Sequence, residues 1–234
     1  MNNKGYLVLY IRFIYILKFL YNIEKGGCFY ENTGFKEFVS SAFAGFSISL
    51  GCMIYMILTN KVLGALFFTV GLFMVLTRNY NLYTGKVALL TDNIKYIFNL
   101  VNIWLGNLFG AAVMTIFTKY SKLHYLVADA QVIVDAKLSQ GYLSSFILAI
   151  LCGIIIYLAV DTYKRLQDCG KYIGLFVFIP LFIICGFEHC VANMYYILMA
   201  GELSIEIVIF TIVVTVGNAV GSIVYKLFEK IYQR

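Results

Sequence analysis

The sequence has few of the residues on which soluble domains and most enzymes depend. Charged residues make up only 13% of its 234 residues, whereas a soluble domain of this length would carry about a quarter. Its only two histidines, His124 and His189, exclude a histidine-rich metal centre or multi-haem framework. No HExxH or GxSxG motif occurs, so we expect no enzyme, no metal and no cofactor.

Cysteine usage and net charge exclude further classes of protein. The six cysteines form no CxxC pair, and four of them lie inside apolar runs. Such cysteines act as small buried hydrophobic residues rather than as a disulfide framework or a metal site. The formal net charge of +6 does not indicate nucleic-acid binding, because the basic residues lie at the ends of apolar segments, where they report topology.

Long apolar segments are what the chain has in abundance. Hydrophobic residues make up 62% of it, and a membrane-spanning helix needs about 20 of them in succession. We predict an all-α integral membrane protein with a bundle of six spans, at residues 38–58, 62–90, 97–117, 143–160, 172–200 and 205–227. The second span is interrupted at 77–86 and the fifth at 186–193, and residues 118–140 have the spacing of an amphipathic surface helix.

The distribution of basic residues predicts the orientation of the spans. Both tails and the loops after the second and fourth spans hold 12 Lys and Arg residues, against 3 on the opposite side. Both termini are therefore expected in the cytoplasm, in a multi-pass protein of the cell's inner membrane. Residues 36–228 form the predicted transmembrane domain. Residues 1–35 are interpreted as an interfacial helix and cytoplasmic tail, with an unprocessed first span as the alternative.

The two halves of the predicted bundle resemble each other. A Gly-Asn-x-x-Gly string occurs at 106–110 in the third span and again at 217–221 in the sixth, where paired glycines allow close helix packing. The interruption at Thr84 is matched by one at His189. Three spans followed by three more have opposite orientations, so we predict an inverted 3+3 repeat. Interrupted spans at matching places in two inverted halves point to a transport site.

Polar side chains at these interruptions are the candidate functional residues. His189 can donate a hydrogen bond or a proton to a weak-acid anion, and Thr84 a hydrogen bond, near two half-helix N-termini, which favour negative charge. Glu188 and Asn193 are expected to brace the second interruption, and Lys137 to attract anions if its segment covers a pore mouth. The alternative for each is a structural role, because polar groups at membrane depth also hold helices together.

At these residues the chain resembles the formate/nitrite transporter family. The similarity lies in Phe68–Leu72 with Leu82–Gly85, in Gly186–His189 with Ala192–Met194, and in the two Gly-Asn strings. It implies an aquaporin-like, homopentameric channel with one pore per protomer for small monovalent anions. By position, it implies that Thr84, Lys137 and His189 are polar pore residues and that hydrophobic constrictions are formed by Phe68, Leu72, Tyr83, Ile156 and Phe182.

Two departures from the family pattern bear on the anion. Gly153 stands where asparagine is frequent in the fourth span, and Lys86 adds a cation beside the first interruption. A less polar site favours hydrosulfide over formate and nitrite, which remain candidates together with chloride, with protons moving alongside the anion. The alternative function is a channel for neutral small solutes, although the paired Asn-Pro-Ala loops of aquaporins do not occur.

Overall fold

The computed structural model describes residues 33–232, and in that range every regular element is a helix. The chain divides into two compact units, residues 1–37 and 38–234, and the second holds all of the features described below. The interfacial helix expected within residues 1–35 lies outside the described residues, except for the start of α2 at Thr33.

Four helices are long and apolar enough to cross a membrane. They are α2 (Thr33–Ile57), α5 (Ile97–Lys119, preceded by the 3-10 turn η2, Ile94–Tyr96), α7 (Tyr142–Arg165) and α10 (Ile205–Tyr232). Each exceeds the roughly 20 residues that a bilayer requires. Their bounds match four of the predicted spans to within a few residues at most ends and a turn at others.

Shorter apolar helices take the place of the second and fifth predicted spans. The first group is α3 (Lys61–Thr77), the single turn α4 (Tyr83–Lys86) and the 3-10 helix η1 (Val87–Thr91). The second group is α8 (Gly170–Ile184) and α9 (Cys190–Ala200). Both gaps are narrower than predicted, because helical structure already resumes at Tyr83 and at Cys190.

The predicted amphipathic segment forms the 3-10 turn η3 (Lys122–Tyr125) and the helix α6 (Leu126–Ser139). Leu126, Ala130 and Val134 are buried, and their spacing of four residues places them on one face of the helix. That face packs against α9. The remaining faces carry Asp129, Asp135 and Lys137, so α6 lies along the bundle rather than within it.

Glycines bring the helices of each half into backbone contact. A Cβ atom on Gly110 of α5 would overlap the carbonyl oxygen of Ala42 in α2, and one on Gly221 of α10 would overlap that of Ile150 in α7. Only glycine allows such an approach. The glycine pairs therefore allow the close helix packing expected of the repeated strings, and the structure shows that they join α2 to α5 and α7 to α10.

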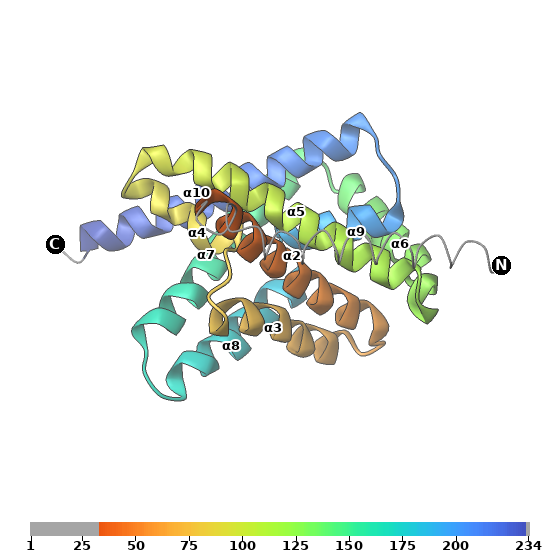
Figure 1. Ribbon diagram of the computed structural model, residues 1–234, viewed down its shortest axis with the longest axis horizontal. Coiled ribbons are helices and arrows are strands. Elements are labelled where there is room, and N and C mark those ends of the chain that lie inside the picture. The colour runs from red at the N-terminus through yellow and green to blue at the C-terminus, as the bar shows by residue number, and fades with distance from the viewer. Residues whose placement is uncertain (1–32, 233–234) are drawn as a thin grey trace, which may run out of the picture. The chain divides into compact units, whose positions relative to one another are not determined.

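The same close approach occurs at Gly153, where the family resemblance led us to expect asparagine. A Cβ atom there would lie 2.3 Å from the carbonyl oxygen of Asn218, so no side chain fits between α7 and α10. The segments before the two interruptions also meet, since α3 and α8 lie side by side (Figure 1).

Candidate functional site

A buried asparagine holds each interruption in place. Asn107 of α5 accepts a hydrogen bond from the backbone N–H of Tyr83 (2.9 Å) and donates to the carbonyl oxygens of Asn81 (2.9 Å) and Ser41 (2.8 Å). The side chain thus satisfies backbone groups on both sides of the start of α4. At membrane depth, such groups need protein partners because lipid offers none.

Asn218 of α10 makes the same three contacts in the second half. Its Oδ1 accepts from the backbone N–H of Cys190 (2.9 Å), and its Nδ2 donates to the carbonyl oxygens of Glu188 (2.7 Å) and Ala149 (2.8 Å). Tyr83 and Cys190 are each the first residue of the helix that resumes. The repeat is therefore visible atom by atom, and the Gly-Asn strings carry it through the asparagine as well as the glycines.

This equivalence corrects the predicted alignment of the two interruptions. The clamped residues are 107 positions apart (83 and 190), whereas Thr84 and His189 are 105 apart. His189 therefore corresponds to Leu82, because each is the N-cap of its resumed helix. Thr84 lies further into its segment, as the second residue of α4. The two side chains meet across the site instead of occupying matched positions.

The two resumed segments also differ in length, which changes the expectation of paired half-helix N-termini. α9 has eleven residues, but α4 has four and then tightens into the 3-10 helix η1. A helix dipole needs several aligned peptide groups to build up. Only the second interruption thus has the half-helix that was expected in both.

His189 and Thr84 form a direct hydrogen bond in the interior. The Nε2 atom of His189 lies 3.0 Å from Oγ1 of Thr84, and the two residues are only 3% and 1% exposed. The other ring nitrogen, Nδ1, accepts a hydrogen bond from the backbone N–H of Ala192 at 3.1 Å. An accepting Nδ1 carries no proton, so the neutral ring holds its proton on Nε2 and donates it to Thr84.

Aromatic rings pack beside this pair. Phe182 of α8 lies against the His189 ring with the centroids 5.9 Å apart, and Phe68 of α3 meets Phe182 edge-on at 5.8 Å. Tyr83 is buried next to Thr84 and donates its hydroxyl to the carbonyl oxygen of Thr215. Of the five predicted constriction residues, Phe182 thus contacts the histidine, Phe68 contacts Phe182, and Tyr83 precedes the threonine.

The other two predicted constriction residues are buried elsewhere in the same apolar core. Leu72 lies on α3 one turn beyond Phe68 and lines a pocket with Leu82 and Val160. Ile156 is buried on α7. Leu72 lines the same pocket as Lys86, the residue directly before η1.

Glu188 is the centre of a second polar cluster. Its carboxylate accepts hydrogen bonds from Lys137 (2.6 Å), Asn193 (2.8 Å) and Gln140 (2.8 Å), and the residue is 1% exposed. A buried carboxylate is tolerable only when its charge is paired and its oxygens are satisfied. Asn193 binds this side chain, whereas the backbone groups at the interruption are held by Asn218.

Lys137 is therefore not a free cation over the site. Its ammonium is paired with Glu188, although its side chain keeps 19% exposure. One of its three N–H donors is used in that bond, which leaves others for an approaching anion. The pair attracts an anion less strongly at long range than the unpaired lysine that the sequence suggested, since the two charges largely cancel.

Sequence reasoning missed three polar residues of these clusters. Asn107 and Asn218 lie inside the very strings that were read for their glycines, so their repetition was the available signal. Gln140 gave no such signal, because a single glutamine at the end of an amphipathic helix is usually solvated. Among residues 33–232, no group of three or more His, Cys, Asp or Glu side chains is arranged to hold a metal ion.

Comparison with known proteins places this geometry in a family. The profile of the formate/nitrite transporter family matches residues 27–229. The nitrite transporter NirC of Escherichia coli K12 is 27% identical over 175 residues, covering 67% of this chain and 65% of NirC. The formate channel BtFdhC of Bacillus thuringiensis is 30% identical over 178 residues, 69% of this chain and 68% of BtFdhC. The chain thus aligns to slightly less than two thirds of the length of NirC.

A solved structure has the same fold. A pentameric formate channel with formate bound superposes with a TM-score of 0.76 at 24% identity, covering 87% of this chain and 99% of that one. These relatives are named as transporters and channels rather than as enzymes. The resemblance seen in the sequence is confirmed by the family match, and the chain belongs to the formate/nitrite transporter family.

Proposed function

We propose that the chain forms a transmembrane channel for small monovalent anions of weak acids, with the His189–Thr84 pair as its central polar site. The observation that carries this proposal is the buried hydrogen bond between two residues from the two interruptions, beside the ring of Phe182, which in turn meets that of Phe68. Nitrite and formate are named for the relatives NirC and BtFdhC, and both are anions of this class.

The proposed architecture is an aquaporin-like protomer with six spans, two of them broken, in an inverted repeat. The identical contacts of Asn107 and Asn218 support the repeat, since each fixes a broken span from the helix that follows it. A homopentamer in the inner membrane, with both termini in the cytoplasm, completes the proposal. The named pentameric channel has the same fold, and the basic residues of the loops support the orientation.

His189 acts in this proposal as a hydrogen-bond donor rather than as an acid. The ring is neutral with its proton on Nε2, and protonation of Nδ1 would break the bond from Ala192 that caps α9. Giving up the Nε2 proton would leave an imidazolate, and the anion of a weak acid is too weak a base to remove that proton. The anion therefore takes the place of the Thr84 oxygen at Nε2, while the Thr84 hydroxyl turns to donate a second bond.

The apolar rings set the energetic problem that this site solves. Moving a bare anion into hydrocarbon costs tens of kcal/mol by a Born estimate, and neither the neutral His189 ring nor Thr84 offers it a full opposite charge. Two aligned donors lower that cost at the narrowest point, and the Lys137–Glu188 pair presents free N–H groups at one approach. A proton taken from solvent by the anion can lower the cost further, so we propose that proton movement accompanies flux.

Hydrosulfide is the favoured substrate within this class. Gly153 offers no side chain on α7, so the donors near the centre come from His189 and Thr84. Formate and nitrite each have two oxygens that accept hydrogen bonds, whereas hydrosulfide has one sulfur atom with a diffuse charge, which needs fewer donors. Formate and nitrite remain second candidates, and chloride is the control of equal charge.

Stopped-flow uptake into proteoliposomes tests the proposal. Hydrosulfide, formate, nitrite and chloride are compared in one preparation, with protein-free vesicles as the baseline. We expect flux for the weak-acid anions, hydrosulfide fastest, with little for chloride. Osmotic water permeability in the same vesicles addresses the alternative, because fast water or glycerol flux without anion flux would support a neutral-solute channel instead.

A further inference from the structure

A pocket beside the first interruption is lined in part by two lysines. Leu72, Leu82 and Gly85 form its apolar part, and Lys86 and Lys164 lie at its rim. None of the residues that line it is acidic. Leu72 and Leu82 are buried, whereas Lys86 is partly exposed and Lys164 exposed, so the pocket has the layout of an approach from solvent toward the interior.

Neither lysine of this pocket has an ion-pair partner among residues 33–232. This contrasts with Lys137 near the other end of α7, whose charge is cancelled by Glu188. Lys164 is the second-last residue of α7, whereas Gln140, which also binds Glu188, lies just before α7 begins. The two approaches to the site are thus electrostatically different, with the unpaired charge at the end that carries Lys86.

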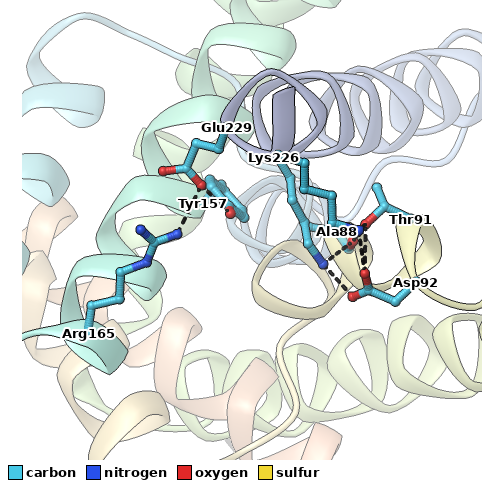
Figure 2. Close-up of polar contacts among 8 residues, drawn as sticks. Ala88, Thr91, Asp92, Tyr157, Arg165, Lys226 and Glu229 are labelled. Carbon is cyan, nitrogen blue, oxygen red and sulfur yellow. Dashed lines mark hydrogen bonds and ion pairs between the residues drawn. The ribbon is translucent and has the colours of Figure 1, made fainter. Parts of the chain in front are cut away.

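The nearby carboxylates are held by other groups. Asp92 accepts from Lys226 (2.5 Å) and Lys230 (2.6 Å), and Lys226 also donates to the carbonyl oxygen of Ala88 in η1. Figure 2 shows this carboxylate turned toward α10. Its two lysines thereby fasten η1, which follows directly after Lys86.

A second set of contacts occupies the acidic groups of α7 and α10. Glu229 accepts from the hydroxyl of Tyr157 (2.7 Å) and from Arg165 (3.3 Å), as Figure 2 shows. Arg165 also binds Asp161 at 2.7 Å. Asp92, Glu229 and Asp161 are therefore each paired with another cation, and none of them forms an ion pair with Lys86 or Lys164.

We propose that Lys86 and Lys164 form a second anion-binding station, which concentrates small monovalent anions in the pocket before or after they pass the central site. The inference rests on the proposed function, since it gives that channel an asymmetric pair of mouths. With the termini in the cytoplasm, the station is the cytoplasmic mouth. Its ligand is the permeating anion itself, held loosely by two ammonium groups without a fixed cradle.

The local potential of the pocket can be measured without transport. Leu76 lines the pocket and is partly exposed, so Leu76→Cys, in a chain without its other accessible cysteines, reports reaction rates with anionic and cationic methanethiosulfonates. Each lysine at ~10 Å in water changes the local concentration of a unit charge about twofold. Replacing Lys86 and Lys164 by Gln should lower the anionic-to-cationic rate ratio roughly tenfold, and less at high salt.

A matched control uses Lys95, an exposed lysine of η2 that does not line the pocket. Lys95→Gln should leave the rate ratio within about twofold of the parent chain. An unchanged ratio in the double variant, or an equal fall in the control, would overturn the proposal. In proteoliposomes at low ionic strength, the double variant should show about two- to fourfold slower anion uptake at low substrate concentration.

The outcomes separate this proposal from the proposed function. If the parent chain carries no anion flux, the proposed function fails while the rate ratio still reports the charge of the pocket. If the parent chain conducts and the double variant matches it in both flux and rate ratio, only the second station fails.

Discussion

Replacing Asn218 by leucine should destabilise the protein far more than an ordinary polar deletion in a membrane helix. Leucine is nearly isosteric with asparagine, so the change removes hydrogen bonds without creating a large cavity. Three bonds are lost, to Cys190, Glu188 and Ala149. Ala149 keeps its helical partner within α7, but the N–H of Cys190 and the carbonyl of Glu188 are left unpaired in a buried site.

The magnitude follows from those two orphaned groups. An unsatisfied buried backbone group costs about 1–3 kcal/mol, which gives about 2–6 kcal/mol for the pair. Hydrogen bonds between membrane helices average only about 0.6 kcal/mol, because the unfolded state in the membrane also finds partners. Three such bonds still give about 2 kcal/mol, so a loss of at least about 2 kcal/mol is expected.

Ser222→Ala supplies a matched control on the same helix. Ser222 is buried one turn beyond Asn218, and its hydroxyl donates to the carbonyl of Gly153 at 3.0 Å. That carbonyl also accepts the helical hydrogen bond of α7, so removing the Ser222 hydroxyl leaves no buried group without a partner. The change should cost below about 1 kcal/mol. Denaturation of the purified protein in mixed micelles measures both variants. If Asn218→Leu proves no less stable than Ser222→Ala, the clamp does not hold the second interruption.

Three further predictions address the other contacts. Glu188→Gln should lower stability and anion flux, because it leaves Lys137 charged without a partner, and the added change Lys137→Met should restore part of the stability in a double-mutant cycle. Gly153→Ala should impair folding, measured as the yield of monodisperse protein, since its methyl group would overlap the backbone of α10; a normal yield would refute the close contact. The pKa of Asp92 is lowered to about 2, first by the hydrogen bond from Lys226. Asp92→Asn should therefore be less stable than the parent at pH 7 and approach its stability only below about pH 2, because this contribution is complete above the ordinary carboxyl pKa of about 4 and is lost as pH falls through the lowered value. The half-exposed side chain limits the difference to below about 1 kcal/mol, and a difference that persists at the lowest pH would show that it does not come from the ionised carboxylate.

The fold could be read from the sequence where the signal is one-dimensional. Apolar length predicts α2, α5, α7 and α10, and the glycine spacing predicts close packing of the third and sixth spans, which are α5 and α10. Polar residues inside the apolar run around His189 mark the interruption, because few other reasons place a glutamate and a histidine there. These signals depend on burial and helix periodicity, and both can be read from residues that are close together in the sequence.

The pairing of side chains across the site was beyond such signals. Whether Lys137 faces Glu188 or solvent depends on the rotation of α6 against α9, which its weak amphipathic pattern does not fix. Likewise, the sequence alignment of Thr84 with His189 missed the equivalence of Leu82 and His189. That equivalence is defined by the hydrogen bonds of Asn107 and Asn218. Register between distant segments is fixed by three-dimensional hydrogen bonds, and a single sequence does not show them.

Anion flux through His189→Asn tests the role of the central site most directly. Asparagine is a good N-cap and can still accept from the backbone of Ala192, so α9 should keep its cap, but its shorter side chain cannot place a donor where Nε2 lies beside Thr84. Losing one hydrogen bond to a charged group costs about 1.5–3 kcal/mol. We therefore predict a roughly ten- to hundredfold fall in hydrosulfide and formate flux in a protein of near-normal stability, whereas undiminished flux in this variant and in His189→Phe would contradict the role of the central histidine.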